Sequence, residues 1–197
     1  MPNSPAIFVE TQARTTAFWA IPEVHSDWFD GIGALGQSRA ELALMALRNM
    51  SNEAVATSSL TVDWPLADGD TLAEFATFAG FCVHSTQSEV MLDPDLTRAL
   101  VNSVNPVVLE RYRDAVRNKT LRSMEITWRE SGSCVQPLGL GVGMAIAACH
   151  SIGPSVAERV KLKLPKFPLL AFDVKRPLLC SELNQWLEEM YREWLCR

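Results

Sequence analysis

The sequence predicts a mainly α-helical protein: a single compact domain of about six helices, preceded by an irregular N-terminal arm. Apolar residues recur at helical spacing in most segments. Capping residues stand where many of these segments begin, and no segment has a convincing strand pattern. Apolar residues make up 48% of the 197 residues and charged residues 21%, which is typical of a globular domain with one core.

Residues 1–37 form the predicted arm. Pro2, Pro5 and Pro22 interrupt any regular element in this segment, and three glycines loosen its end. The segment is too apolar for a free tail, so we expect it to lie across the body of the protein or across a partner. The helical domain is expected to occupy residues 38–197.

Two capping boxes predict the first two helices. In SRAE (38–41) and in TLAE (71–74), a hydroxyl side chain and a glutamate three positions later can reciprocally satisfy backbone donors. The first helix is expected to begin at Ser38, and the second at Asp70 or Thr71. Apolar residues cover more than one side of the second segment, which predicts a central, well-buried helix.

Two prolines indicate the next two helix starts. Asp93 precedes Pro94, and Asn105 precedes Pro106. Each pair places a capping side chain before a proline at the first helical position, where no amide donor is needed. The second of these helices ends in basic residues, which are favourable at a helix C-terminus.

Three other segments have weaker patterns. Residues 58–69 are rich in turn-forming residues and predict a loop or a short extended piece. Residues 121–128 can form a strand or a short helix, because their apolar residues alternate. Residues 130–137 are expected to form a loop.

The apolar run LGLGVGMAIAACHSI (138–152) predicts a buried helix that begins among glycines. Gly153-Pro154 breaks the chain after it, and a third capping box, SVAE (155–158), predicts a further helix. Pro165 and Pro168 are expected to end that helix.

The C-terminal segment predicts an amphipathic helix. Its apolar stripe consists of Leu179, Leu183, Trp186, Leu187, Met190 and Trp194. The opposite side is expected to carry Glu182, Gln185, Glu188, Glu189 and Arg192. Such a helix must bury its tryptophan side against the body of the protein or against another chain.

Charge and cysteine content bear on partners and location. A net charge of −5 and scattered basic residues argue against nucleic-acid binding. Five cysteines without a CxxC pair, and an N-terminus without a secretory pattern, predict a cytoplasmic protein. The longest apolar run is shorter than the roughly 20 residues of a membrane-spanning helix, so no direct membrane insertion is expected.

Gly139, Gly141 and Gly143 allow two interpretations. Glycine-rich loops can hold nucleotide phosphates, but the dinucleotide motif has the spacing G-x-G-x-x-G after a strand, and the Walker motif needs Gly-Lys-Ser/Thr. Here the spacing is G-x-G-x-G after a proline. We favour a close-packed helix start that another helix crosses, and a phosphate-binding loop is the alternative.

No catalytic, cofactor-binding or metal-binding residue is predicted. Cys82 with His84, and Cys149 with His150, lack the spacing of a structural zinc site, and cysteine is usually buried. Ser133 does not lie in a G-x-S-x-G elbow. The protein is therefore expected not to be an enzyme, and no small-molecule substrate is evident.

The tryptophans favour a protein-interaction surface. Trp19 and Trp28 lie in the arm, and Trp186, Met190 and Trp194 lie on the last helix. Tryptophan is common where an apolar surface meets a polar edge, including at interfaces. We expect the arm and the last helix together to bind a partner, and completion of the core is the alternative for each tryptophan.

Two segments resemble a known family. LAEFATFAGFCVHSTQSEVMLDPDLTRALVNSVNP (72–106) and LGLGVGMAIAACHSIGPSVAERVKLKLP (138–165) are similar to the central and later parts of the SctK/YscK/OrgA family, cytosolic accessory subunits of the bacterial type III secretion injectisome. The acidic, amphipathic C-terminal helix also suits that family. The resemblance covers the last two-thirds or so of the chain, rests on apolar pattern and glycines, and is loose in the arm.

The resemblance implies a non-enzymatic adaptor of the sorting platform, without catalytic residues, in a bacterial pathogen or symbiont. Such a subunit links the inner-membrane ring protein to the cytosolic pod protein. It lies in the cytoplasm, peripheral to the inner membrane through protein partners. The alternatives are a small helical enzyme or phosphate-ligand-binding protein that uses the stretch from Gly139 to Gly143, and a cytosolic secretion chaperone or regulator.

Overall fold

The computed structural model describes residue 14 and residues 23–29, 62–85, 93–120, 136–166 and 177–195. In these ranges the protein has six α-helices and no strand, which confirms the predicted mainly α class. The helices are α3 (Gly69–Ser85), α5 (Pro94–Asn102), α6 (Pro106–Arg117), α7 (Pro137–Ile152), α8 (Pro154–Lys163) and α9 (Pro177–Leu195), with 3-10 turns η1 (Ser26–Phe29) and η3 (Trp64–Leu66). No helix among the described residues is long and apolar enough to cross a bilayer.

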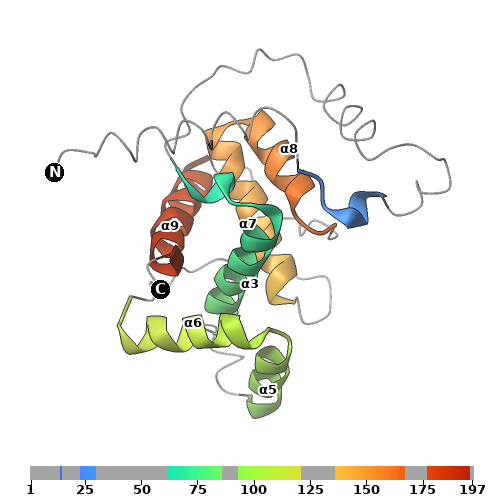
Figure 1. Ribbon diagram of the computed structural model, residues 1–197. Helices are drawn as coiled ribbons and strands as arrows, with labels where there is room; N and C mark the ends of the chain where they lie inside the picture. The colour runs from blue at the N-terminus through green and yellow to red at the C-terminus, as the bar shows by residue number, and fades with distance from the viewer. Residues whose placement is uncertain are drawn as a thin grey trace.

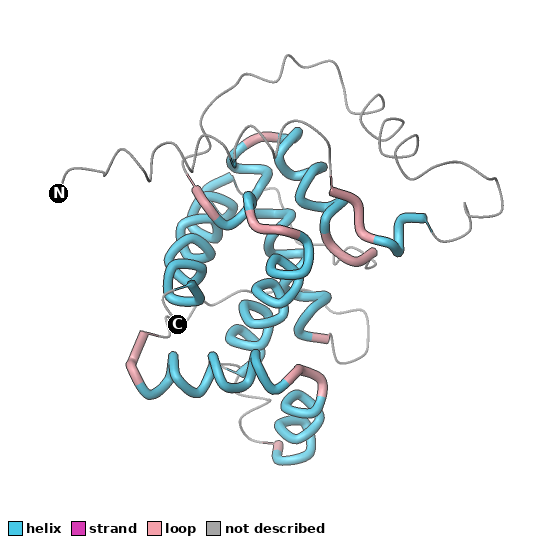
Figure 2. The backbone as a smooth tube through the Cα atoms, viewed as in Figure 1, coloured by secondary structure: helices cyan, strands magenta, loops and turns pink. Residues whose placement is uncertain are grey.

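α3 and α7 form the centre of the molecule, and both are buried along most of their length. α8 and α9 pack against α7, and α9 also contacts α3 (Figure 1). α6 lies across one end of α3, and α5 lies next to α6, farther from the centre of the bundle (Figures 1 and 2). We call α5 and α6 together the α5–α6 limb.

The cap of α3 differs from the predicted one. Asp68 accepts a hydrogen bond from the backbone N–H of Thr71 at 2.8 Å, and the Thr71 hydroxyl donates to the same carboxylate at 2.9 Å. Asp68 therefore caps the helix, and the predicted capping box at Thr71 is wrong, because Thr71 already lies in the first turn. The hydrogen bond from the Thr71 backbone is the main reason that the pKa of Asp68 is lowered. The predicted burial of α3 is confirmed.

The two proline signals are confirmed. Pro94 and Pro106 are the first residues of α5 and α6. Asn105 accepts from the N–H of Val108 at 2.8 Å, and Asp93 accepts from the N–H of the residue after the proline at 2.8 Å. Both caps satisfy a backbone donor that the first helical turn leaves without an intrahelical partner.

The chain break between α7 and α8 is also confirmed, with a different cap. Gly153 precedes Pro154, and its carbonyl accepts from the N–H groups of Val156 and Ala157 at 3.1 Å. No side chain caps α8, so the capping box predicted at Ser155 is wrong. α8 ends at Lys163, before the extended Leu164 and Pro165, as predicted.

Several predictions lie outside the described residues. They are the boundary of the arm at residue 37, the helix from Ser38, the segment 121–128, most of the loop 130–137, and the roles of Pro168, Ser133 and Trp19.

Candidate protein-interaction surface

Three of the predicted interaction residues lie in the core of the chain. Trp186, Met190 and Trp194 are 5%, 2% and 6% exposed. α9 packs on α7 and α3, so the described part of its apolar stripe, from Leu183 to Trp194, is buried within the same chain. In this fold these side chains belong to the core and stabilise the domain.

Trp194 joins three helices. Its ring lies 5.2 Å from that of Phe78 and 6.4 Å from that of Phe75, between centroids, and both phenylalanines belong to α3. The Arg111 guanidinium of α6 lies 5.1 Å from the Trp194 ring centroid. The edge-on contact with Phe75, the tilted contact with Phe78 and the cation over the indole add to the stabilisation from burial alone.

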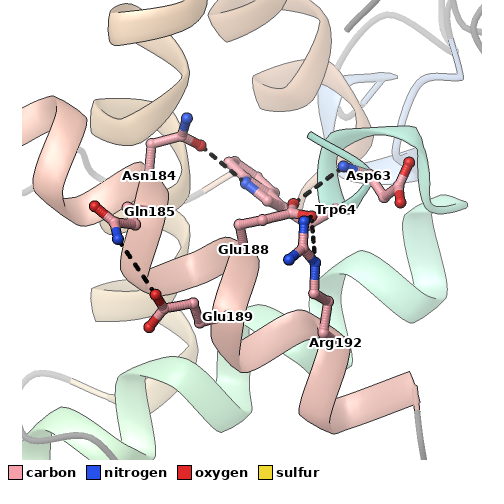
Figure 3. A network of polar contacts seen from close by, with 7 residues as sticks. All are labelled: Asp63, Trp64, Asn184, Gln185, Glu188, Glu189 and Arg192. Atoms are coloured by element: carbon pink, nitrogen blue, oxygen red, sulfur yellow. Dashed lines mark hydrogen bonds and ion pairs between the residues drawn. The ribbon is translucent and has the colours of Figure 1, made fainter. Parts of the chain in front are cut away.

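Trp64, in the turn-rich stretch 58–69, is a residue whose role the sequence analysis missed. The side chain is fully buried, and its indole N–H donates to the Asn184 amide oxygen of α9 at 3.1 Å (Figure 3). The η3 turn therefore attaches to α9 through a buried tryptophan. A large aromatic residue in a turn next to a proline was the available signal, because such a side chain needs a place in the core.

The structure differs from the predicted polar side of α9 at Glu188. It is buried, and one carboxylate oxygen accepts from the backbone N–H of Asp63 at 3.0 Å (Figure 3). Its other oxygen accepts from the Arg192 guanidinium at 3.0 and 3.1 Å. Glu188 thus holds the start of η3, whereas Glu182 and Gln185 are exposed as predicted.

Lys163 holds the other side of η3. Its buried ammonium donates to the carbonyl of Ala67 at 2.6 Å and to that of Pro65 at 3.3 Å. Burial lowers the pKa of Lys163, and the nearby carboxylates of Glu23 and Asp68 oppose that change. The η3 segment is therefore held between α8 and α9.

The lowered pKa of Lys163 predicts an alkaline effect on stability. The unfolded chain holds the Lys163 proton up to its ordinary pKa of 10.5, whereas the folded chain releases it at lower pH. Between these pKa values the unfolded state binds more protons, so the free energy of unfolding rises with pH. Burial raises the pKa of Tyr191, so the titration of Tyr191 lowers the free energy of unfolding as pH rises. Tyr191 is present in both the wild type and the Lys163→Met variant, so it does not account for a difference between them.

We expect the difference in unfolding free energy between wild type and Lys163→Met to move in favour of the wild type as pH rises from about 7 towards 10.5. Urea unfolding at a series of pH values measures this difference. A difference that stays constant across the alkaline range would contradict the prediction.

Trp28 lies with a short part of the arm on the end of α8. Its indole N–H donates to the Leu164 carbonyl at 3.0 Å, and the backbone N–H of His25 donates to the Leu162 carbonyl at 2.7 Å. Glu23 accepts from the first backbone N–H of α3 at 2.7 Å. We call residues 23–28 the docked segment.

The α5–α6 limb exposes apolar side chains. Val107 and Val116 are 47% and 48% exposed, and they lie on opposite sides of α6, nine residues apart. One side of α6 is held on the bundle, where Val108 and Ala115 are buried and the Tyr112 ring packs edge-on against α3. The remaining surface of the limb faces outward, and we take it as the candidate protein-interaction surface.

Gly141 of α7 has a packing role. Gly141 lies so close to α3 that an added Cβ would be 1.7 Å from the carbonyl oxygen of Ala76. Gly80 of α3 approaches α7 equally closely, since its Cβ would be 1.9 Å from the carbonyl oxygen of Pro137. The predicted helix crossing is confirmed. The alternative of a phosphate-binding loop does not fit, because these glycines are helical and buried.

The two cysteines among the described residues are also buried. Cys82 and Cys149 lie in the core, and burial raises the pKa of each thiol well above its ordinary value. His150 is exposed whereas Cys149 is buried, so these neighbours face different surroundings. Among the described residues, no three histidine, cysteine or acidic side chains come close enough together to hold a metal ion.

Comparison with known proteins returned no match: no family model, no curated protein and no solved structure is significantly similar to this chain.

Proposed function

We propose that this protein is a non-enzymatic adaptor of a bacterial type III secretion sorting platform, which links the inner-membrane ring protein to the cytosolic pod protein. The single observation that carries the proposal is the α5–α6 limb, which extends from the bundle and exposes Val107 and Val116. An adaptor needs surface that is not required by its own core, and the two exposed flanks of α6, beside its buried face, meet that need.

The use of polar groups within the described residues supports an adaptor. Glu188, Asn184 and Lys163 hold the η3 turn, and Glu23 and Asp68 bind backbone N–H groups at the start of α3. The two described cysteines are buried, with raised thiol pKa values. The polar side chains thus have structural partners and the two cysteines are buried, so a structural role accounts for them without a reaction.

The resemblance supplies the secretion context of the proposal. Segment 72–106 contains most of α3 and all of α5, and segment 138–165 contains most of α7 and all of α8. The resembling segments therefore include the central helix pair and the first helix of the limb. A cytoplasmic protein, attached to the inner membrane through its partners, is the corresponding location.

The proposal predicts that charges on the limb weaken partner binding. We expect the double variant Val107→Asp/Val116→Asp to bind the pod protein at least tenfold more weakly than wild type, a loss of about 1.4 kcal/mol. Aspartate at two half-exposed positions disfavours an apolar contact but costs the monomer little. Biolayer interferometry with purified pod and ring proteins measures both affinities.

Leu195→Asp provides the matched control, because Leu195 is 54% exposed and lies on α9, outside the limb. Its affinity should equal that of wild type, and thermal unfolding should show all variants folded. If wild type binds neither the pod protein nor the ring protein, the adaptor proposal is wrong. If it binds and the limb variant binds equally well, the limb is not the contact surface.

A further inference from the structure

The docked segment makes a shallow contact with the helical body. Every residue from 23 to 28 is at least partly exposed, although the segment makes specific hydrogen bonds. Its binding groups come from three places on the body: the start of α3, the end of α8, and the extended residues that follow α8. These places together form what we call the α8-end surface.

One end of the α8-end surface suits a carboxylate. The first N–H of α3 donates to Glu23 at 2.7 Å, and the buried ammonium of Lys163 attracts the same carboxylate. The start of a helix carries partial positive charge and N–H groups without intrahelical partners. A negative side chain is therefore favoured here by two independent groups.

The other end suits an indole. The Nζ atoms of Lys161 and Lys166 each lie 5.7 Å from the centroid of the Trp28 ring. The Leu164 carbonyl accepts from the indole N–H. Cations near the ring and an acceptor at its N–H select tryptophan over phenylalanine, which has no such donor.

The body itself positions these groups. Leu162 and Leu164 have carbonyls that the end of α8 leaves available, and the following Pro165 keeps Leu164 extended. Between the two ends, the Leu162 carbonyl accepts from the backbone of the docked segment. The backbone groups that bind the docked segment therefore belong to the helical body.

We infer that the α8-end surface is a peptide-binding site, which the docked segment occupies within its own chain and which a partner segment of the same chemistry can take over. That partner segment carries a carboxylate five residues before a tryptophan, the spacing of Glu23 and Trp28. The inference adds a second contact surface to the proposed adaptor, but it does not depend on the secretion context or on the limb.

A peptide of residues 21–30 (IPEVHSDWFD), labelled with fluorescein, tests the inference by fluorescence anisotropy on the full chain. The docked segment competes at the high effective concentration of a tethered ligand. Trp28→Ala removes its main anchor, so this variant should bind the peptide saturably and at least tenfold more tightly than wild type. A peptide with alanine in place of its tryptophan should not bind.

Charge reversal on the α8-end surface provides a further control. Adding Lys161→Glu and Lys166→Glu to the Trp28→Ala chain should abolish peptide binding, while circular dichroism shows the helical fold retained. If Trp28→Ala does not fold, Glu23→Ala replaces it and should likewise bind more tightly than wild type.

Absence of saturable peptide binding to the Trp28→Ala variant, or to Glu23→Ala where it replaces it, would overturn the inference. Equal affinity of the wild type and of that variant for the peptide would also overturn it. Binding of the peptide that lacks tryptophan would do the same. The assay contains no pod or ring protein, so its failure is distinct from a failure of the adaptor proposal.

Discussion

Gly141→Ala is expected to destabilise the protein by about 3 kcal/mol or more, although it adds a single methyl group. The added Cβ would lie 1.7 Å from the carbonyl oxygen of Ala76 and 2.4 Å from its carbonyl carbon. These are backbone atoms of α3, so no side-chain rotation can relieve the overlap. α3 and α7 must move apart, and the core contacts along both helices then loosen.

Gly153→Ala is the matched control for this change. The methyl group there meets no atom within 4 Å, and the φ angle of 164° is extended backbone that any residue adopts. Urea unfolding followed by circular dichroism should show a large loss for Gly141→Ala and a change within about 0.5 kcal/mol for Gly153→Ala. Equal unfolding free energies for the two variants would contradict the close helix crossing.

The second large effect is expected at Trp64. Trp64→Ala should lower the free energy of unfolding by about 3–5 kcal/mol, because it removes a fully buried aromatic side chain and leaves a cavity. The same change leaves the Asn184 amide oxygen without its indole donor. A loss of this size is a large fraction of the about 5–15 kcal/mol that stabilises a typical domain.

Two further variants provide comparisons for Trp64→Ala. Trp64→Phe retains most of the apolar volume and removes the indole N–H, so it should cost less than Trp64→Ala. Trp28→Ala removes a tryptophan that is partly exposed, and it should cost less again. Denaturant unfolding of the three proteins measures this order. If Trp64→Ala costs no more than Trp28→Ala, η3 is not an integral part of the core.

Local patterns predicted the helix starts that depend on interactions between residues close together in the sequence. Asp93 and Asn105 cap their helices because a side chain and a backbone N–H two or three residues away are enough to form the bond. The glycines of α7 predicted a helix crossing, since small residues allow close backbone approach. Asp68 was missed as the cap of α3 because Thr71 with Glu74 satisfied the same pattern, and spacing alone does not distinguish overlapping caps.

The partner surface was less predictable. The described part of the apolar stripe of α9, from Leu183 to Trp194, was identified correctly, but the sequence left open whether this chain or another would cover it. α9 packs on α7 and α3, and Trp186 and Trp194 are buried. Periodicity places a residue on a side of a helix and says nothing of what packs there. Glu188 shows the same limit, because its position predicted solvent whereas η3 covers it.

By itself, the sequence determined the α class, the proline-marked helix starts, the break at Gly153 and the amphipathic character of α9. Each of these follows from interactions among residues a few positions apart. Only the tertiary structure decided that Trp64 and Lys163 hold η3, and that Trp28 docks on the end of α8. Those contacts join residues about 100 positions apart or more, and such pairings depend on how whole helices pack.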